Sequence, residues 1–162
     1  MKLSLAISAP CPLWRGLPRA RAMARETVAA CLGESGLGVR EGAEMSLCLT
    51  SDADLRALNA RWRGVDKPTN VLSFPAVPAE RMSEAQMLGD IALAYETLAR
   101  EAEESGASLA DHYRHLVAHG FLHLIGYDHQ TDEEAERMEA LEKRILARLG
   151  VADPYADGVV VE

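Results

Sequence analysis

The alternation of apolar and polar positions predicts short β-strands at several points along the chain. Leu3, Leu5 and Ile7 alternate with smaller or polar neighbours, so they share one face of a first strand. A second alternating stretch and two short apolar runs predict further strands, at 45–49, 71–74 and 89–95. We therefore expect about four strands.

Apolar residues at a helical spacing predict five helices between and after these strands. They are expected at 18–32, 51–62, 96–104, 108–125 and 131–149. Ser51 and Thr131 each precede an acidic residue three positions on, which is the pattern of a helix cap. The order lacks the regular alternation of a doubly wound sheet and favours an α+β fold, with a mixed sheet of about four strands covered by helices.

The length and the apolar content suit a single domain. With 162 residues and 48% hydrophobic content, the chain can bury one continuous core, so we expect residues 1–162 to form one domain. After Pro154 the tail, 154–162, either adds an edge strand or frays.

The net charge of -8 narrows the function classes. It argues against a protein that coats nucleic acid non-specifically, because such binding depends on Lys and Arg neutralising phosphates.

No segment approaches the roughly 20 apolar residues of a membrane-spanning helix, and the start does not read as a secretion signal. The three cysteines include no CxxC pair, so no disulfide framework is predicted. We expect a cytoplasmic protein without membrane contact.

Three histidines near the centre of the C-terminal half predict a metal site. His119 and His123 lie four positions apart on a predicted helix, so both imidazoles project from one face. Gly126 is suited to end that helix with a positive φ and to turn the chain back, which brings His129 to the same ion. Three neutral nitrogen ligands leave an open position, the pattern of a catalytic zinc that promotes hydrolysis, although nickel, cobalt and copper also suit imidazole.

Other polar residues near this site have open roles. Asp128, or an Asp from another segment, would turn the site into a closed structural one by acting as a fourth ligand. His112 and His115 lie on the same predicted helix and either line or support the metal site or pack as ordinary helix residues.

The spacing HxxxHxxGxxH also occurs in the metzincin proteases, which carry a Glu directly after the first histidine as general base. In this chain that position is Gly120. A peptidase would lack its proton acceptor here, so a metalloprotease with metzincin-like ligand spacing is the less favoured function.

Three segments carry a resemblance to a known family. They are HGFLHLIGYDH at 119–129, RGVDKPTNVLSFP at 63–75 and LGDI at 88–91. With Gly120 in place of a catalytic Glu, the chain closely resembles the YbeY family of endoribonucleases, which act in ribosomal RNA maturation. The resemblance covers nearly the whole chain, and the two long motifs together are very specific.

The resemblance implies one zinc ion on His119, His123 and His129 and hydrolysis of single-stranded RNA. It also implies a role in processing the 3′ end of small-subunit (16S) ribosomal RNA and in ribosome quality control, with the small subunit and its proteins as partners. Arg63 is implied to matter for activity, and its planar guanidinium suits a phosphate if a loop position lets it reach into a cleft. Lys67 would add charge to the same wall.

The hypothesised mechanism relies on Arg63 and Asp128. We expect the scissile phosphate to approach the open metal position, with its developing charge held by Arg63. The nucleophile is either water or the neighbouring ribose 2′-hydroxyl, and Asp128 either orients a histidine or deprotonates the water. An alternative of a different class is a ribosome assembly factor whose metal stabilises the fold and whose acidic surface docks to a basic ribosomal protein.

Overall fold

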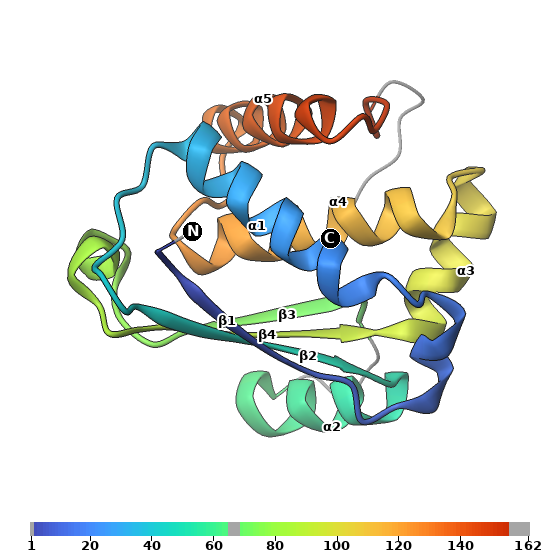
Figure 1. The fold of residues 1–162 in the computed structure, drawn as a ribbon. Helices are drawn as coiled ribbons and strands as arrows, with labels where there is room; N and C mark the ends of the chain where they lie inside the picture. The colour runs from blue at the N-terminus through green and yellow to red at the C-terminus, as the bar shows by residue number, and fades with distance from the viewer. Residues whose placement is uncertain (1, 65–68, 156–162) are drawn as a thin grey trace.

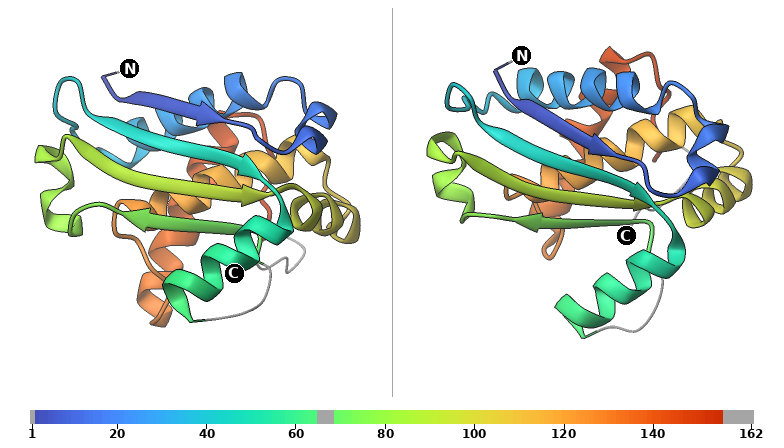
Figure 2. Two further views of the ribbon diagram at one scale, coloured as in Figure 1. Left: turned by 90° about the horizontal axis from the view of Figure 1, so that it is seen from below. Right: turned by 60° about the horizontal axis from the view of Figure 1, so that its bottom comes forward.

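A computed structural model of the protein describes residues 2–64 and 69–155. Its centre is a four-stranded sheet in the order β1-β2-β4-β3 (Figure 1, Figure 2). The strands are β1 (Ser4–Ser8), β2 (Glu44–Thr50), β3 (Val71–Pro75) and β4 (Met87–Ala94). β1, β2 and β4 are parallel, whereas β3 runs antiparallel to β4 at one edge. The predicted α+β fold with a mixed sheet is confirmed.

Helices cover both faces of this sheet. They are α1 (Ala20–Ser35), α2 (Asp52–Arg63), α3 (Tyr95–Ser105), α4 (Leu109–Leu124) and α5 (Asp132–Arg148). α1 and α4 lie on one face, α5 packs outside against both of them, and α2 lies on the opposite face (Figure 1). Two 3-10 helices, which are too short to show an apolar period in the sequence, are η1 (Pro12–Gly16) and η2 (Ala79–Glu84).

The side chains of the strands divide between two sides of the sheet. On the side of α1 and α4, Met45, Leu47 and Ile91 are buried in the larger core. On the side of α2, Leu55 packs with Leu72 in a smaller cluster. Because each fully buried apolar side chain of this size contributes roughly 1.5–3 kcal/mol, the larger core holds α4 firmly on the sheet.

Helix α4 carries four of the five histidines and begins at a capped end. The Ser108 hydroxyl accepts a hydrogen bond from the Asp111 backbone N–H at 3.1 Å. Ser51 and Thr131 cap α2 and α5 in the same way, so the caps predicted there are confirmed.

Two sequence predictions fall outside the described residues. One is the role of Lys67, which lies in the segment between α2 and β3, and the other is the edge strand or frayed end beyond residue 155. Across 2–64 and 69–155, no helix is both long and apolar enough to cross a membrane.

Candidate metal centre

Helix α4 places His119 and His123 on one face, as their spacing predicts. Their Nε2 atoms lie 3.1 Å apart, and His119 is buried. Two nitrogens bound to one tetrahedral zinc at about 2.0–2.1 Å would lie about 3.3 Å apart. The observed separation is close to this value, so the pair fits a shared ion with little movement.

The chain reverses after α4 at Gly126, whose φ is 111°. Its N–H donates to the His123 carbonyl at 3.1 Å. A Cβ at this position would lie 2.4 Å from the Cβ of Ala79 in η2, so both the backbone angle and the space require glycine. The predicted turn is confirmed, and it brings His129 back to the face of α4 that carries the other two histidines.

The three histidines form a cluster with converging nitrogens. One nitrogen from each of His119, His123 and His129 lies within 4.8 Å of the other two. The His129 ring centroid is 5.0 Å from that of His123 and 5.9 Å from that of His119. The donor set and its geometry therefore fit a divalent transition metal with three imidazole ligands and an open position.

The surroundings of His123 favour the neutral form of its imidazole, which is the form that binds a metal. Burial, together with the neighbouring His119 and His129, lowers the pKa of His123 to about 4. His123 is therefore neutral near pH 7. A neutral imidazole is the form that ligates a metal, so binding there requires no proton release from this residue.

Gly120 explains why no carboxylate follows the first histidine. A Cβ at Gly120 would lie 2.9 Å from Val71 Cγ2 and 3.3 Å from Ile91 Cγ2. The Ser73 hydroxyl donates to the Gly120 carbonyl at 2.7 Å, which ties α4 to β3 at this point. The position where metzincins carry their general base therefore faces the sheet and has no room for a side chain, which removes the basis for a protease mechanism.

Asp128 lies beside the ligand that follows it. Its Oδ1 accepts a hydrogen bond from the backbone N–H of His129 at 2.8 Å, and the side chain is half-buried. The carboxylate thus shapes the turn that presents His129. The contact is to the backbone of His129 and not to its ring, so both roles considered for Asp128 stay predictions.

Arg63 was expected in a loop, but it is the exposed last residue of α2. The helix continues through Arg63 because a basic residue suits a helix C-terminus, and it ends at Gly64, whose φ is 69°. α2 lies on the sheet face opposite α4 (Figure 1). Among the described residues, no hydrogen bond or ion pair joins Arg63 to the three histidines.

The sequence reasoning missed Glu142 of α5, which contacts the metal cluster directly. Its Oε1 accepts a hydrogen bond from His119 Nδ1 at 2.6 Å. Its Oε2 accepts from His115 Nε2 at 3.1 Å and from the Tyr155 hydroxyl at 2.5 Å. The sequence does carry a sign of this role, because Glu142 is a charged residue within the buried stripe of α5, four residues after Met138.

His112 and His115 are buried and paired with carboxylates. His112 Nε2 lies 3.0 Å from Glu101 Oε1, and His115 bonds Glu142. His115, His119 and Glu142 form a second group that could in principle hold an ion. Their separations of 2.6 and 3.1 Å are those of hydrogen bonds between N–H donors and a carboxylate, so we interpret this group as a support network.

Comparison with known proteins identifies the family. The chain matches the family model described as Endoribonuclease YbeY over residues 17–150. A Bradyrhizobium diazoefficiens protein named Endoribonuclease YbeY is 53% identical over 148 residues, which are 89% of this chain and 80% of that protein. A Methylocella silvestris protein of the same name is 46% identical over 157 residues, 97% of this chain and 88% of that protein.

Among solved structures, the fold is similar to the solution structure of a Thermotoga maritima protein. The two align with a TM-score of 0.56 and 20% sequence identity, over 91% of each chain. This likeness supports the fold, and the family model and the curated relatives cover most of the chain. The chain therefore belongs to the Endoribonuclease YbeY family.

Proposed function

We propose that the protein is a zinc-dependent endoribonuclease that cleaves single-stranded RNA during ribosomal RNA maturation. The observation that carries this proposal is the cluster of His119, His123 and His129 in a chain whose relatives are named endoribonucleases. We infer a cytoplasmic protein that acts at the 3′ end of small-subunit ribosomal RNA and in ribosome quality control.

The proposed division of labour follows the geometry of the cluster. His119, His123 and His129 would hold the zinc ion, and Asp128 would keep His129 in place through its backbone N–H. Zinc bound there would polarise a phosphoryl oxygen and lower the pKa of a water molecule. Asp128 is also the proposed proton acceptor, because it is the carboxylate nearest in sequence to the three ligands. It would accept the proton from water or from a ribose 2′-hydroxyl.

Arg63 is the proposed contact to the phosphate. Its guanidinium is exposed at the end of α2, where it can turn toward an RNA strand without losing burial or breaking the core. A net charge of -8 disfavours a broad basic surface for RNA, so individual cations must bring the phosphate to the metal. A planar guanidinium pairs with phosphate through two parallel hydrogen bonds.

The test combines metal analysis with cleavage of a defined single-stranded RNA. Zinc should copurify stoichiometrically, a chelator should stop cleavage, and a duplex of the same sequence should resist it. Arg63→Ala should keep zinc and lose cleavage, whereas Arg40→Ala, which changes another exposed arginine, should keep both. Cleavage that persists after zinc removal would overturn the proposal, and cyclic phosphate ends would assign the attack to the 2′-hydroxyl.

A second candidate function rests on the acidic charge. A net charge of -8 suits docking to a basic ribosomal protein better than it suits naked RNA. In that case the protein would assist ribosome assembly, and its metal would stabilise the fold. Rescue of ribosome maturation by Arg63→Ala, in a form that binds zinc but does not cleave, would favour this function.

A further inference from the structure

Glu142 is a fully buried carboxylate whose charge needs an explanation. Its side chain is 0% exposed, and the ion pairs that the described residues give it involve only His115 and His119. Both of its oxygens lie within hydrogen-bond distance of a histidine nitrogen, Oε1 at 2.6 Å from His119 Nδ1 and Oε2 at 3.1 Å from His115 Nε2. A buried charge costs several kcal/mol unless a partner compensates it, so its position calls for a cation nearby.

The bond from His119 to Glu142 selects one tautomer of the histidine. A neutral imidazole carries its proton on either Nδ1 or Nε2. An ionised carboxylate only accepts, so the 2.6 Å contact places the proton of His119 on Nδ1. The lone pair is then on Nε2, which lies 3.1 Å from His123 Nε2 inside the cluster of three histidines.

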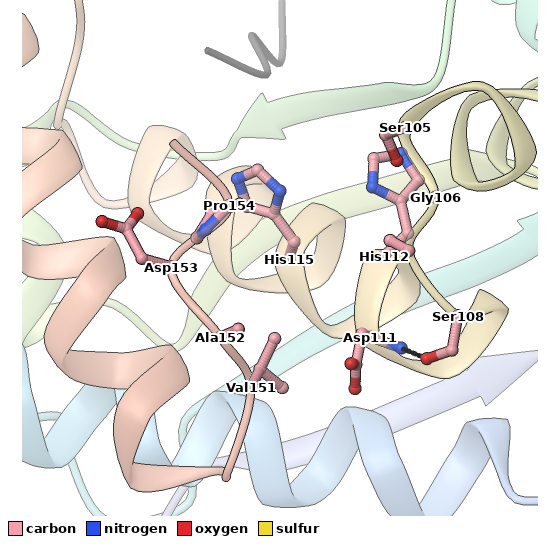
Figure 3. Close-up of a pocket in the computed structure, with 11 residues that line it drawn as sticks. Ser105, Gly106, Ser108, Asp111, His112, His115, Val151, Ala152, Asp153 and Pro154 are labelled. Atoms are coloured by element: carbon pink, nitrogen blue, oxygen red, sulfur yellow. Dashed lines mark hydrogen bonds between the residues drawn. The ribbon is translucent and has the colours of Figure 1, made fainter. Parts of the chain in front are cut away.

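The other oxygen of Glu142 is held from two further directions. His115 Nε2 and the Tyr155 hydroxyl both donate to Oε2, at 3.1 Å and 2.5 Å. The Tyr155 ring also meets the His115 ring edge-on, with centroids 5.6 Å apart. The segment before Tyr155 runs beside α4 at His115, where Figure 3 shows Pro154 next to the imidazole. With both oxygens engaged, the carboxylate cannot rotate away from His119.

We propose that Glu142 is a positioning residue that holds His119 in the tautomer whose Nε2 binds the metal, and that Tyr155 completes its support from the C-terminal segment. The inference rests on the proposed metal site and adds the residues that orient it. A carboxylate that accepts from the far nitrogen of a ligand histidine also makes that ligand more basic. A metal ion held by His119 would supply the positive charge that compensates Glu142.

The tautomer is tested without metal, by nitrogen-15 NMR of the histidine side chains in the zinc-free protein. In the wild type, His119 should show a protonated Nδ1 and an unprotonated Nε2. Glu142→Gln keeps the size of the side chain but offers one acceptor oxygen to three donors, so the proton of His119 should distribute over both nitrogens. A wild-type His119 protonated on Nε2, or an unchanged tautomer in Glu142→Gln, would overturn the proposal.

Zinc affinity provides the second measurement, by competition with a chromophoric chelator. Glu142→Gln should weaken zinc binding about 10–100-fold, the usual loss for a partner of a ligand histidine. Tyr155→Phe should weaken it less, and Glu136→Gln, which removes the same charge from an exposed position of α5, should leave it unchanged.

The two measurements separate this inference from the proposed function. If the wild type binds no zinc, the metal-dependent function fails, while the tautomer of His119 still decides the role of Glu142. If Glu142→Gln does not fold, Tyr155→Phe decides, and an unchanged zinc affinity in that variant contradicts the inference.

Discussion

The two ends of α4 use the same side chain in opposite ways. Toward the N-terminus, His112 and His115 are buried and each bonds a carboxylate, of Glu101 and of Glu142. At the C-terminus, the ring of His123 meets edge-on the ring of His129, which follows the helix, and no carboxylate among the described residues bonds either ring.

His119 lies between these two ends and shares both environments. Its Nδ1 donates to Glu142, and its Nε2 faces His123. Spacing along a helix therefore does not by itself separate a metal ligand from a residue that supports one. An imidazole whose N–H groups are satisfied by carboxylates stabilises the fold, whereas imidazoles whose free nitrogens converge can hold an ion.

The largest effect is expected at the C-terminal end of the helix. His123→Ala should abolish stoichiometric zinc in the purified protein and reduce RNA cleavage by more than about 100-fold, because a lost ligand should exceed the loss for an outer partner. Metal analysis and cleavage of single-stranded RNA measure the two quantities. Stoichiometric zinc in His123→Ala would refute the site.

At the N-terminal end, we expect a change in stability in place of a change in metal binding. His112→Ala removes the histidine partner of the part-buried Glu101, which then keeps only its hydrogen bonds from Asn70, and should lower the free energy of unfolding by about 1–3 kcal/mol. Denaturant unfolding of the zinc-free protein measures this. His129→Ala is the matched control, since an exposed histidine should change the zinc-free stability by no more than about 0.5 kcal/mol. The distinction between the two ends fails if His112→Ala loses zinc and keeps its stability.

Low pH should reduce the stability that the Glu101–His112 pair gives to the N-terminal end of α4. Burial would raise the pKa of Glu101, but hydrogen bonds from His112 and Asn70 outweigh it, so the net shift is downward. The unfolded chain then binds more protons than the folded one as the pH falls below the ordinary Glu value of about 4.3, and stability decreases. The free energy of unfolding should therefore drop between about pH 5 and pH 3.

Glu101→Gln tests the source of that acid sensitivity. The variant should show a shallower pH slope in the same window, with a residual slope from Glu142, whose pKa is lowered to about 2. Denaturant unfolding of the zinc-free protein at several pH values gives both slopes. Identical slopes in the variant and the wild type would show that the pair does not contribute.

The smallest effect is expected at the first turn of α4. Ser108→Ala removes the acceptor for the Asp111 N–H and should lower the free energy of unfolding by about 1 kcal/mol. Zinc affinity should stay at the wild-type value, because the cap is more than two turns from His119. Thermal unfolding and chelator competition check the two statements, and a loss of zinc affinity would mean that the ends of the helix are coupled.

The elements and the ligand cluster could be predicted because they depend on local spacing. Alternating positions mark the strands, and His119, Gly126 and His129 lie within 11 residues, where helix geometry and one turn determine their relative positions. The two 3-10 helices could not be predicted in this way, because segments of five and six residues are too short to show a helical period of apolar residues. Arg63 was expected in a loop because the helix was predicted to end at Trp62, one residue before its observed end.

The amino-acid sequence by itself determined that three histidines can meet one ion and that Gly120 leaves no carboxylate directly after the first of them. Only the tertiary structure decided what surrounds them. Glu142 reaches His119 from another helix, and Tyr155 reaches Glu142 from the C-terminal segment. Such contacts depend on how α5 packs against α4, which no local pattern encodes. Local geometry therefore specifies the ligands, whereas long-range packing specifies which nitrogen of His119 is free to bind.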